Sequence, residues 1–380
     1  MREPALQMVE SDAALAGIVD TLGSEPEYGL DTEFMAEKTY YPQLCLVQLA
    51  WPGNVALVDP FEVDVRALGA VLERPGTMIT HAGGADLPII ERACGGRPAT
   101  LFDTQLAAGF IGQGQPSLVS LVSSLVDVQL DKGDQLSDWS RRPLTPSARR
   151  YAAGDVAYLL ALTATLRDRL EKLGRLAWAA AECEILRQTP ARDADLDTVW
   201  WRIKGARSLR GDRACIAQTV AAWREHRAQH VDRPPRFVLS DLALAAIVQR
   251  PPASIDELLR VRGAGSLPRA AARDILEVVE RGRAMDRSEL RAPPKHRDDP
   301  AVDAAVGILT GWTSQVAAGE RVDARLLATR DDVKALVNGR PSRLDNGWRA
   351  EMIGGDLRAI VDGEAVVRLV DGGKRLQIER

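Results

Sequence analysis

Cysteine is scarce in this chain of 380 residues: there are four, and no two of them form a Cys-x-x-Cys pair. The absence of such pairs excludes a zinc ribbon, and so few cysteines in so long a chain argue against a disulfide framework. We interpret Cys45, Cys94, Cys183 and Cys215 as buried, reduced thiols of a cytoplasmic protein.

Membrane and targeting segments are absent as well. No run of residues is long and apolar enough to span a bilayer. The N-terminus carries Glu3, Glu10 and Asp12 with no apolar stretch behind a basic start, so no signal peptide is predicted. A Gly-x-x-x-x-Gly-Lys-Ser/Thr phosphate loop is also missing, which argues against a helicase. We therefore expect a cytoplasmic protein with no membrane contact and no nucleotide cofactor.

The bulk composition is that of ordinary globular material, with 46% hydrophobic and 27% charged residues. The length predicts two or three domains. The formal net charge is −4, so any binding of nucleic acid must depend on local basic patches and bound cations.

Two acids, Asp31 and Glu33, stand at the end of a segment that reads as a strand. The two-residue period of a strand points both carboxylates to one face. Like charges placed side by side favour a divalent metal ion between them. A solvated strand end is the alternative for this pair alone.

The pattern around this pair predicts an α/β arrangement. A helix over residues 12–22 precedes the strand that ends at Phe34, and strands over 44–51 and 54–59 follow, joined by Pro52-Gly53. After this three-strand meander, a helix is expected over 63–72, a strand over 77–81 and a helix over 85–94. Such an order favours a mixed sheet flanked by helices.

Two further acids follow the meander. Asp86 comes directly after His81-Ala82-Gly83-Gly84, at the start of a helix, and the glycines permit a sharp turn that brings it over the edge of the sheet. A favourable charge at a helix N-terminus is the alternative for Asp86. Asp103 opens a helix directly, so we interpret it as an N-cap outside the site.

The last pair lies on a helix that Thr145-Pro146 opens, with threonine as N-cap and proline at the first helical position. Tyr151 and Asp155 are one turn apart on one face of this helix. The small residues 152–154 between them let another element approach closely. Seen alone, such a pair could equally be structural.

In this order the motifs resemble the DEDD superfamily of 3′→5′ exonucleases, in the subgroup with tyrosine in the last motif, and within it the ribonuclease D family. The resemblance covers residues 28–186 and rests on these stretches: 30–34, 39–42, 81–86, 102–105, 130–132, 137–144 and 151–156. It implies a ribonuclease H-like exonuclease domain over 1–195 and a site for two divalent metal ions, Mg²⁺ or Mn²⁺. The departures fall in 132–136, which contain none of the expected metal ligands.

Our hypothesis for the site assigns one role to each residue. Asp31 bridges the two ions, while Glu33 and Asp155 complete the site of the ion that carries the attacking water. Asp86 holds the second ion, partly through water. Tyr151 orients the attacking water, because a phenol with an ordinary pKa of about 10 is a poor base at neutral pH.

Further side chains near these motifs are candidates for contact with a substrate that enters 3′ end first. Aromatic rings stack on bases and cations hold the backbone. The predicted contacts are Phe34, Tyr41, Lys132, Trp139, Arg141 and Arg142. Core packing is the alternative for the aromatic residues.

The second half of the chain is rich in residues that favour helices, with basic residues and prolines between them. It resembles the helicase-and-RNase-D C-terminal (HRDC) domain, a small all-α nucleic-acid-binding module, which we place at 205–288. Residues 325–330 echo 236–241, which suggests a second, divergent copy over 299–380. The tail around Asp371-Gly372-Gly373 alternates and predicts a hairpin.

These features predict a monomeric 3′→5′ exoribonuclease that releases 5′-mononucleotides from the 3′ ends of tRNA precursors and other structured RNAs. A 3′→5′ DNA exonuclease is one alternative, because the metal site does not contact the 2′-hydroxyl. A catalytically inactive RNA-binding adaptor is another. The adaptor reading predicts a missing ligand, whereas all five site residues are present.

Overall fold

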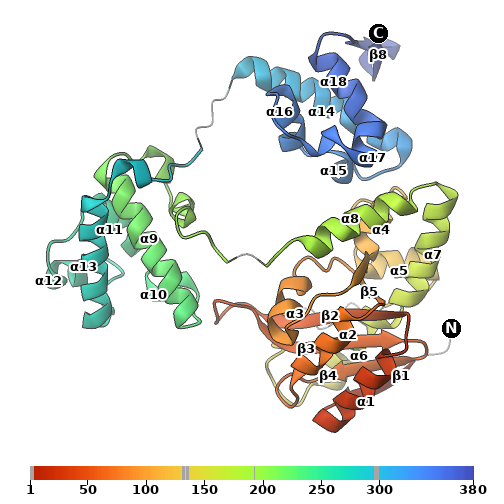
Figure 1. Cartoon of the computed structure of the whole chain (residues 1–380), viewed down its shortest axis with the longest axis horizontal. Helices are drawn as coiled ribbons and strands as arrows, with labels where there is room; N and C mark the ends of the chain where they lie inside the picture. Colours follow the sequence, from red (N-terminus) through yellow and green to blue (C-terminus); the bar gives the residue numbers. More distant parts are fainter. Residues whose placement is uncertain (1–3, 131–132, 134–136, 192, 295–298) are drawn as a thin grey trace. The chain divides into compact units, whose positions relative to one another are not determined.

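Figure 1 shows the computed structural model, which describes residues 4–130, 133, 137–191, 193–294 and 299–380. The chain forms two compact units. One unit contains Met1–Glu33, Leu44–Pro190 and Arg297–Arg380, and the other contains Phe34–Gln43 and Ala191–His296. The first unit therefore holds most of the predicted exonuclease domain together with the C-terminal domain.

A six-stranded sheet of order β1-β4-β3-β2-β5-β6 forms the centre of the first unit. Its strands are β1 (Ala5–Val9), β2 (Glu27–Met35), β3 (Gln43–Trp51), β4 (Asn54–Val58), β5 (Thr77–Thr80) and β6 (Thr100–Asp103). β3 and β4 are antiparallel, whereas β1–β4, β2–β5 and β5–β6 pair in parallel. The predicted mixed sheet and its meander are confirmed.

The local sequence explains most of these strands. The residues of β3 after Gln43 are all buried, and Gly53, at φ 77°, makes the tight link to β4. β1 was not predicted, because it is an edge strand with three exposed residues at its start and has no alternating pattern.

Eight α-helices of this domain are described: α1 (Asp12–Leu22), α2 (Gly69–Glu73), α3 (Asp86–Cys94), α4 (Thr104–Gly109), α5 (Leu118–Val126), α6 (Pro146–Ala157), α7 (Leu159–Lys172) and α8 (Leu176–Gln188). The last three contact β4, β5 and β6 respectively. α6 begins as predicted: the Thr145 hydroxyl accepts the Ala148 N–H at 3.1 Å, and proline follows. The helix expected over 63–72 is instead a 3₁₀ turn followed by the short α2.

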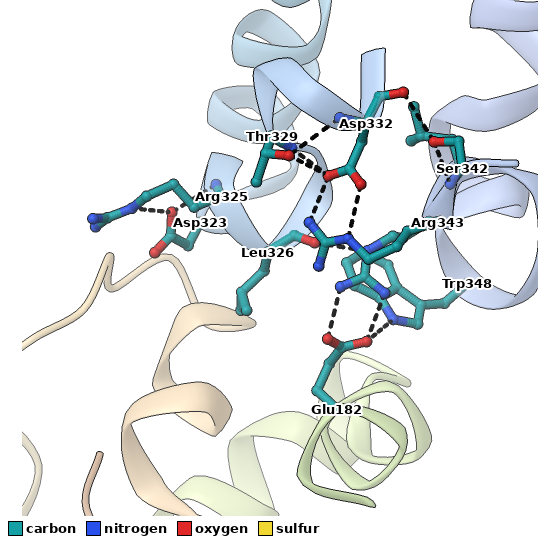
Figure 2. A network of polar contacts seen from close by, with 11 residues as sticks. Glu182, Asp323, Arg325, Leu326, Thr329, Asp332, Ser342, Arg343 and Trp348 are labelled. Atoms are coloured by element: carbon teal, nitrogen blue, oxygen red, sulfur yellow. Dashed lines mark hydrogen bonds and ion pairs between the residues drawn. The ribbon is translucent and has the colours of Figure 1, made fainter. Parts of the chain in front are cut away.

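The C-terminal domain contains α14 (Pro300–Glu320), α15 (Ala324–Leu327), α16 (Arg330–Val337), α17 (Gly347–Arg349), α18 (Gly355–Val361) and the hairpin β7 (Val366–Val370) and β8 (Arg375–Glu379). Glycines 372 and 373 have positive φ in the hairpin turn, as the sequence predicts. Figure 2 shows how this domain meets α8, where Trp348 Nε1 donates to Glu182 at 3.0 Å. The two parts approach closely at Gly109, where a Cβ would lie 2.3 Å from Leu326 Cδ1 and the Leu326 side chain would have to shift.

The second unit is helical and comprises α9 (Asp212–His230), α10 (Pro235–Val238), α11 (Asp241–Gln249), α12 (Ile255–Arg260) and α13 (Arg269–Ala284). Its core gathers fully buried residues of α9, α11 and α13 with Trp200. The β2–β3 loop belongs to this unit: the Tyr40 hydroxyl donates to Glu225 Oε1 at 2.6 Å. Of the helices described in either unit, each is too short or too polar to span a membrane.

The echo between the two helical regions extends to the chain path. α10 and α15 are both helices of four residues, and each is followed by one extended residue, Leu239 or Ala328. A hydroxyl N-cap, Ser240 or Thr329, then opens α11 or α16. Equivalent sequence positions therefore adopt equivalent local structure.

Candidate active site

Three of the predicted carboxylates come together in the structure. Asp31 and Glu33 extend from one face of β2, and Asp155 reaches them from α6. One carboxylate oxygen from each residue lies within 4.8 Å of the others. The alternation of the strand and the position of α6 over the sheet thus produce the cluster that the spacing suggested.

Asp86 lies beside this cluster and outside the 4.8 Å group. It is the first residue of α3 and is buried, and its Oδ1 accepts the hydroxyl of Thr32, the residue between the two acids of β2. The Asp86 charge nevertheless contributes to the raised pKa values of Asp31 and Glu33. Asp86 is therefore close enough to affect the charges of Asp31 and Glu33, although it lies outside the group of three carboxylates.

Burial raises the pKa of each acid, and the charges of neighbouring acids raise those of Asp31 and Glu33 further. Burial, followed by the charges of Asp155 and Asp86, raises the pKa of Glu33 to about 8. Burial raises the pKa of Asp155 to about 7, against a partial opposing effect of the Tyr151 hydroxyl. The pKa of Asp31 lies well above its ordinary value, mainly through burial and then through its acidic neighbours. A cluster of this kind is stabilised by added positive charge, and carboxylate oxygens are the ligands that Mg²⁺ and Mn²⁺ prefer.

Tyr151 occupies the edge of the cluster. Its hydroxyl donates a hydrogen bond to the Asp155 carboxylate, one helical turn away. Burial and the neighbouring acids raise the pKa of this phenol further above its ordinary value. A phenol in that state keeps its proton at neutral pH and can donate a hydrogen bond.

Two of the predicted RNA contacts, Trp139 and Arg142, lie against other parts of the protein. Trp139 is 3% exposed, and its ring centroid lies 6.0 Å from that of Tyr151. The Arg142 guanidinium pairs with the buried Asp59, and its Nη1 donates to the Trp139 carbonyl at 2.8 Å. Its Nη2 also donates to the Cys45 carbonyl at 2.6 Å. The Arg142 side chain thus has internal partners and the Trp139 ring is buried beside Tyr151, while contact of either residue with RNA stays a prediction.

The other predicted contacts have different positions. The Arg141 side chain is 85% exposed and remains a candidate for RNA contact, whereas Lys132 lies outside the described residues. Phe34 and Tyr41 belong to the second unit, where the Tyr41 hydroxyl donates to Asp193 at 3.1 Å.

Sequence analysis did not identify two supporting residues. Thr32, between the two acids of β2, donates its hydroxyl hydrogen bond to Asp86, and no sequence pattern singled it out. Asp59, which follows β4, was read as a strand residue, although it is 1% exposed and pairs with Arg142. A buried acid at a strand end is a recognisable signal for such a role, but its partner is not visible in the local pattern.

Comparison with known proteins places this architecture among established families. Residues 6–171 match a family model described as a 3′-5′ exonuclease, and residues 214–279 match the HRDC domain. The crystal structure of Escherichia coli RNase D, described as an exoribonuclease involved in structured RNA processing, superposes with a TM-score of 0.84 at 31% identity. That match covers 96% of this chain and 99% of the other. The fold and the acidic cluster thus define a 3′→5′ exonuclease with an HRDC domain.

Curated relatives identify the family within this class of exonucleases. Ribonuclease D of Acidiphilium cryptum is 35% identical, over 99% of this chain and 97% of its own length. Ribonuclease D of Escherichia coli is 33% identical, over 91% and 96% respectively. The chain belongs to the ribonuclease D family and is an exoribonuclease that acts on RNA.

Proposed function

We propose that this exoribonuclease releases 5′-mononucleotides by two-metal-ion hydrolysis and trims the 3′ ends of tRNA precursors and other structured RNAs as a monomer. The observation that carries the proposal is the cluster of Asp31, Glu33 and Asp155, whose oxygens lie within 4.8 Å of one another. The match to Escherichia coli RNase D, an exoribonuclease involved in structured RNA processing, covers nearly all of both chains and supports the substrate class.

The proposed roles follow from where each acid lies. Asp31 has three acidic neighbours, since the charges of Asp86, Asp155 and Glu33 each raise its pKa, so it would be the ligand that two ions share. Glu33 and Asp155 would complete one metal site, and Asp86 the other. Bound divalent ions supply a hydroxide at neutral pH and neutralise charge on the phosphate and the leaving 3′-oxygen.

Tyr151 completes this arrangement without transferring a proton. Its hydroxyl is held against Asp155, and Trp139 packs on its ring. A donor fixed in this way would orient the attacking water along the line opposite the leaving oxygen. If Tyr151→Phe retained full activity, this role would be wrong.

Mononucleotide release from a 3′-extended tRNA precursor tests the proposal. We expect release with Mg²⁺ or Mn²⁺, none with EDTA, and a loss of at least about 100-fold in Asp155→Asn, because that substitution removes a metal-ligand charge. Asp168→Asn is the matched control, since this acid lies on the next helix in an exposed pair with Lys172. RNA binding without release under any metal would instead support the adaptor.

The choice between RNA and DNA needs a separate comparison. A single-stranded DNA of the same sequence as a single-stranded RNA substrate presents the same phosphates without the 2′-hydroxyl. Faster release from the RNA is expected for an enzyme of the ribonuclease D family. Equal or faster release from the DNA would favour the DNA exonuclease alternative.

A further inference from the structure

The carboxylate of Asp103 serves two segments at once. It ends β6, caps α4 and is 1% exposed. Its Oδ1 accepts the N–H groups of Gln105 at 2.8 Å and Leu106 at 3.1 Å, which is the expected helix cap. Its Oδ2 accepts the Gly83 N–H at 2.9 Å, and its Oδ1 also accepts the Ala82 N–H at 3.3 Å. Capping accounts for the first two bonds only.

The other two bonds hold a turn whose backbone is strained. Ala82 has φ 59°, a left-handed conformation that residues with a Cβ rarely adopt. Gly83 packs so tightly that a Cβ there would lie 2.5 Å from Thr80 Cγ2. A strained turn persists only where its surroundings determine it, and here a buried carboxylate accepts two consecutive N–H groups.

This turn leads directly into α3 and so sets the position of Asp86 beside the acidic cluster. The Gly83 carbonyl accepts the Leu87 N–H at 3.0 Å, so the turn fixes the first turn of α3. Asp86 is the first residue of that helix, and its carboxylate meets the Thr32 hydroxyl. The turn thus orients Asp86 through its backbone while Thr32 holds the tip of its side chain.

The neighbours of Asp103 strengthen the same connection. Thr80 and Asp103 are register partners at the carboxyl ends of β5 and β6. The Thr104 hydroxyl donates to the Thr80 carbonyl at 3.0 Å, and the Asp103 N–H donates to Cys183 Sγ at 3.2 Å. These bonds fix the backbone that carries the Asp103 carboxylate, independently of the bonds to Ala82 and Gly83.

We propose that Asp103 is a positioning residue for Asp86 and thereby for the second divalent ion. The inference rests on the two-metal function proposed above. Asp103 touches neither ion nor substrate in this assignment; it acts through the backbone of Ala82 and Gly83.

Asp103→Asn separates this role from helix capping. Asparagine caps a helix as well as aspartate does. An amide oxygen in the place of Oδ1 retains the bonds to Ala82, Gln105 and Leu106, and the NH₂ group then faces the Gly83 N–H. Because two N–H donors then face each other, the hydrogen bond from Gly83, the shorter of the two that the turn makes to Asp103, is lost. Asp103→Ser is a second variant, because serine keeps a cap but is too short to reach both segments.

Electron paramagnetic resonance measures how many Mn²⁺ ions the protein binds and how tightly, and it does not require the enzyme to turn over. Wild-type protein should bind two Mn²⁺ ions and Asp86→Asn one. Both Asp103 variants should bind the first ion as wild type does and the second about 10–100-fold more weakly, as for residues that orient a ligand. Their kcat should fall and recover at high Mn²⁺, with an unchanged KM. Loss of a charge alone would weaken both ions and would vary with salt.

Asp299→Asn is the matched control, since this aspartate caps α14 through the Ala301 N–H at 2.9 Å. Two Mn²⁺ ions of wild-type affinity in both Asp103 variants would overturn the positioning role, whatever happened to their thermal stability. Fewer than two ions in the wild-type protein would instead overturn the two-metal function itself.

Discussion

Arg349 and Glu182 form a buried pair with two parallel hydrogen bonds, each of 2.7 Å. Their side chains are 5% and 8% exposed, and Trp348 Nε1 donates to the same carboxylate. Trp348 in turn stacks on Trp178 at 5.5 Å between centroids (Figure 2 shows Trp348 and Glu182). Through this pair the C-terminal domain is joined to α8 as part of one interior.

Arg349→Met should lower the free energy of unfolding by about 3–5 kcal/mol, because it leaves the Glu182 charge buried without its partner. Urea denaturation followed by tryptophan fluorescence measures this change. Adding Glu182→Gln should restore part of the loss by removing the buried charge. Arg358→Met, in an exposed pair with Asp345, is the control, and an equal loss there would contradict the prediction.

Adjacent arginines offer a second matched comparison. Arg142→Gln should cost several kcal/mol of stability, because Asp59 is 1% exposed and would lose its cation. It should also lower kcat with little change in KM, since the carbonyl of Trp139 is freed beside Tyr151. Arg141→Gln should change stability by less than about 0.5 kcal/mol, because its side chain is mostly exposed. Reversal of this order would refute the structural role that its contacts give Arg142.

The metal-free protein should become less stable as pH rises from about 4 to about 8. Unfolded carboxyl groups release their protons near pH 4, whereas Glu33 holds its proton to about pH 8 and Asp155 to about pH 7. Because the folded state binds more protons in this window, the free energy of unfolding falls with increasing pH. Denaturation in EDTA measures the slope, which Asp155→Asn should reduce. A slope that was the same in both proteins would exclude this source.

Metal binding at neutral pH should release protons. The raised pKa values of Glu33 and Asp155 mean that these groups are partly protonated before an ion displaces the protons. Calorimetric titration with Mn²⁺ in two buffers of different ionisation enthalpy should give heats that differ by the number of protons released. Equal heats in both buffers would show that the acids are already ionised.

The sequence predicts the parts of the site that depend on local geometry. A strand places Asp31 and Glu33 on one face, and a helix places Tyr151 and Asp155 one turn apart. The motif order, through its resemblance to a known family, adds that these elements meet. The structure accordingly brings Asp155 of α6 together with Asp31 and Glu33 of the predicted sheet.

What the sequence could not predict are partnerships between distant segments. Arg142 stands in a polar loop and reads as a free cation, yet its partner Asp59 is 83 residues away. Asp103 was correctly interpreted as an N-cap, but its bonds to Ala82 and Gly83 depend on the parallel register of β5 and β6. The turn itself differs from expectation, because its left-handed residue is Ala82 and not a glycine. Local patterns carry no information about such contacts.

The shared chain path of α10–α11 and α15–α16 has an evolutionary consequence. If both arose from one ancestral module by duplication, the copies have since come under different selection. The second copy is constrained by the interior that Trp348 and Arg349 enter, so substitutions there would be removed for their effect on folding. In the first copy, Glu225 and Asp232 instead accept hydrogen bonds from Tyr40 and Tyr41 of the β2–β3 loop, so each copy would keep the residues that its own neighbours require.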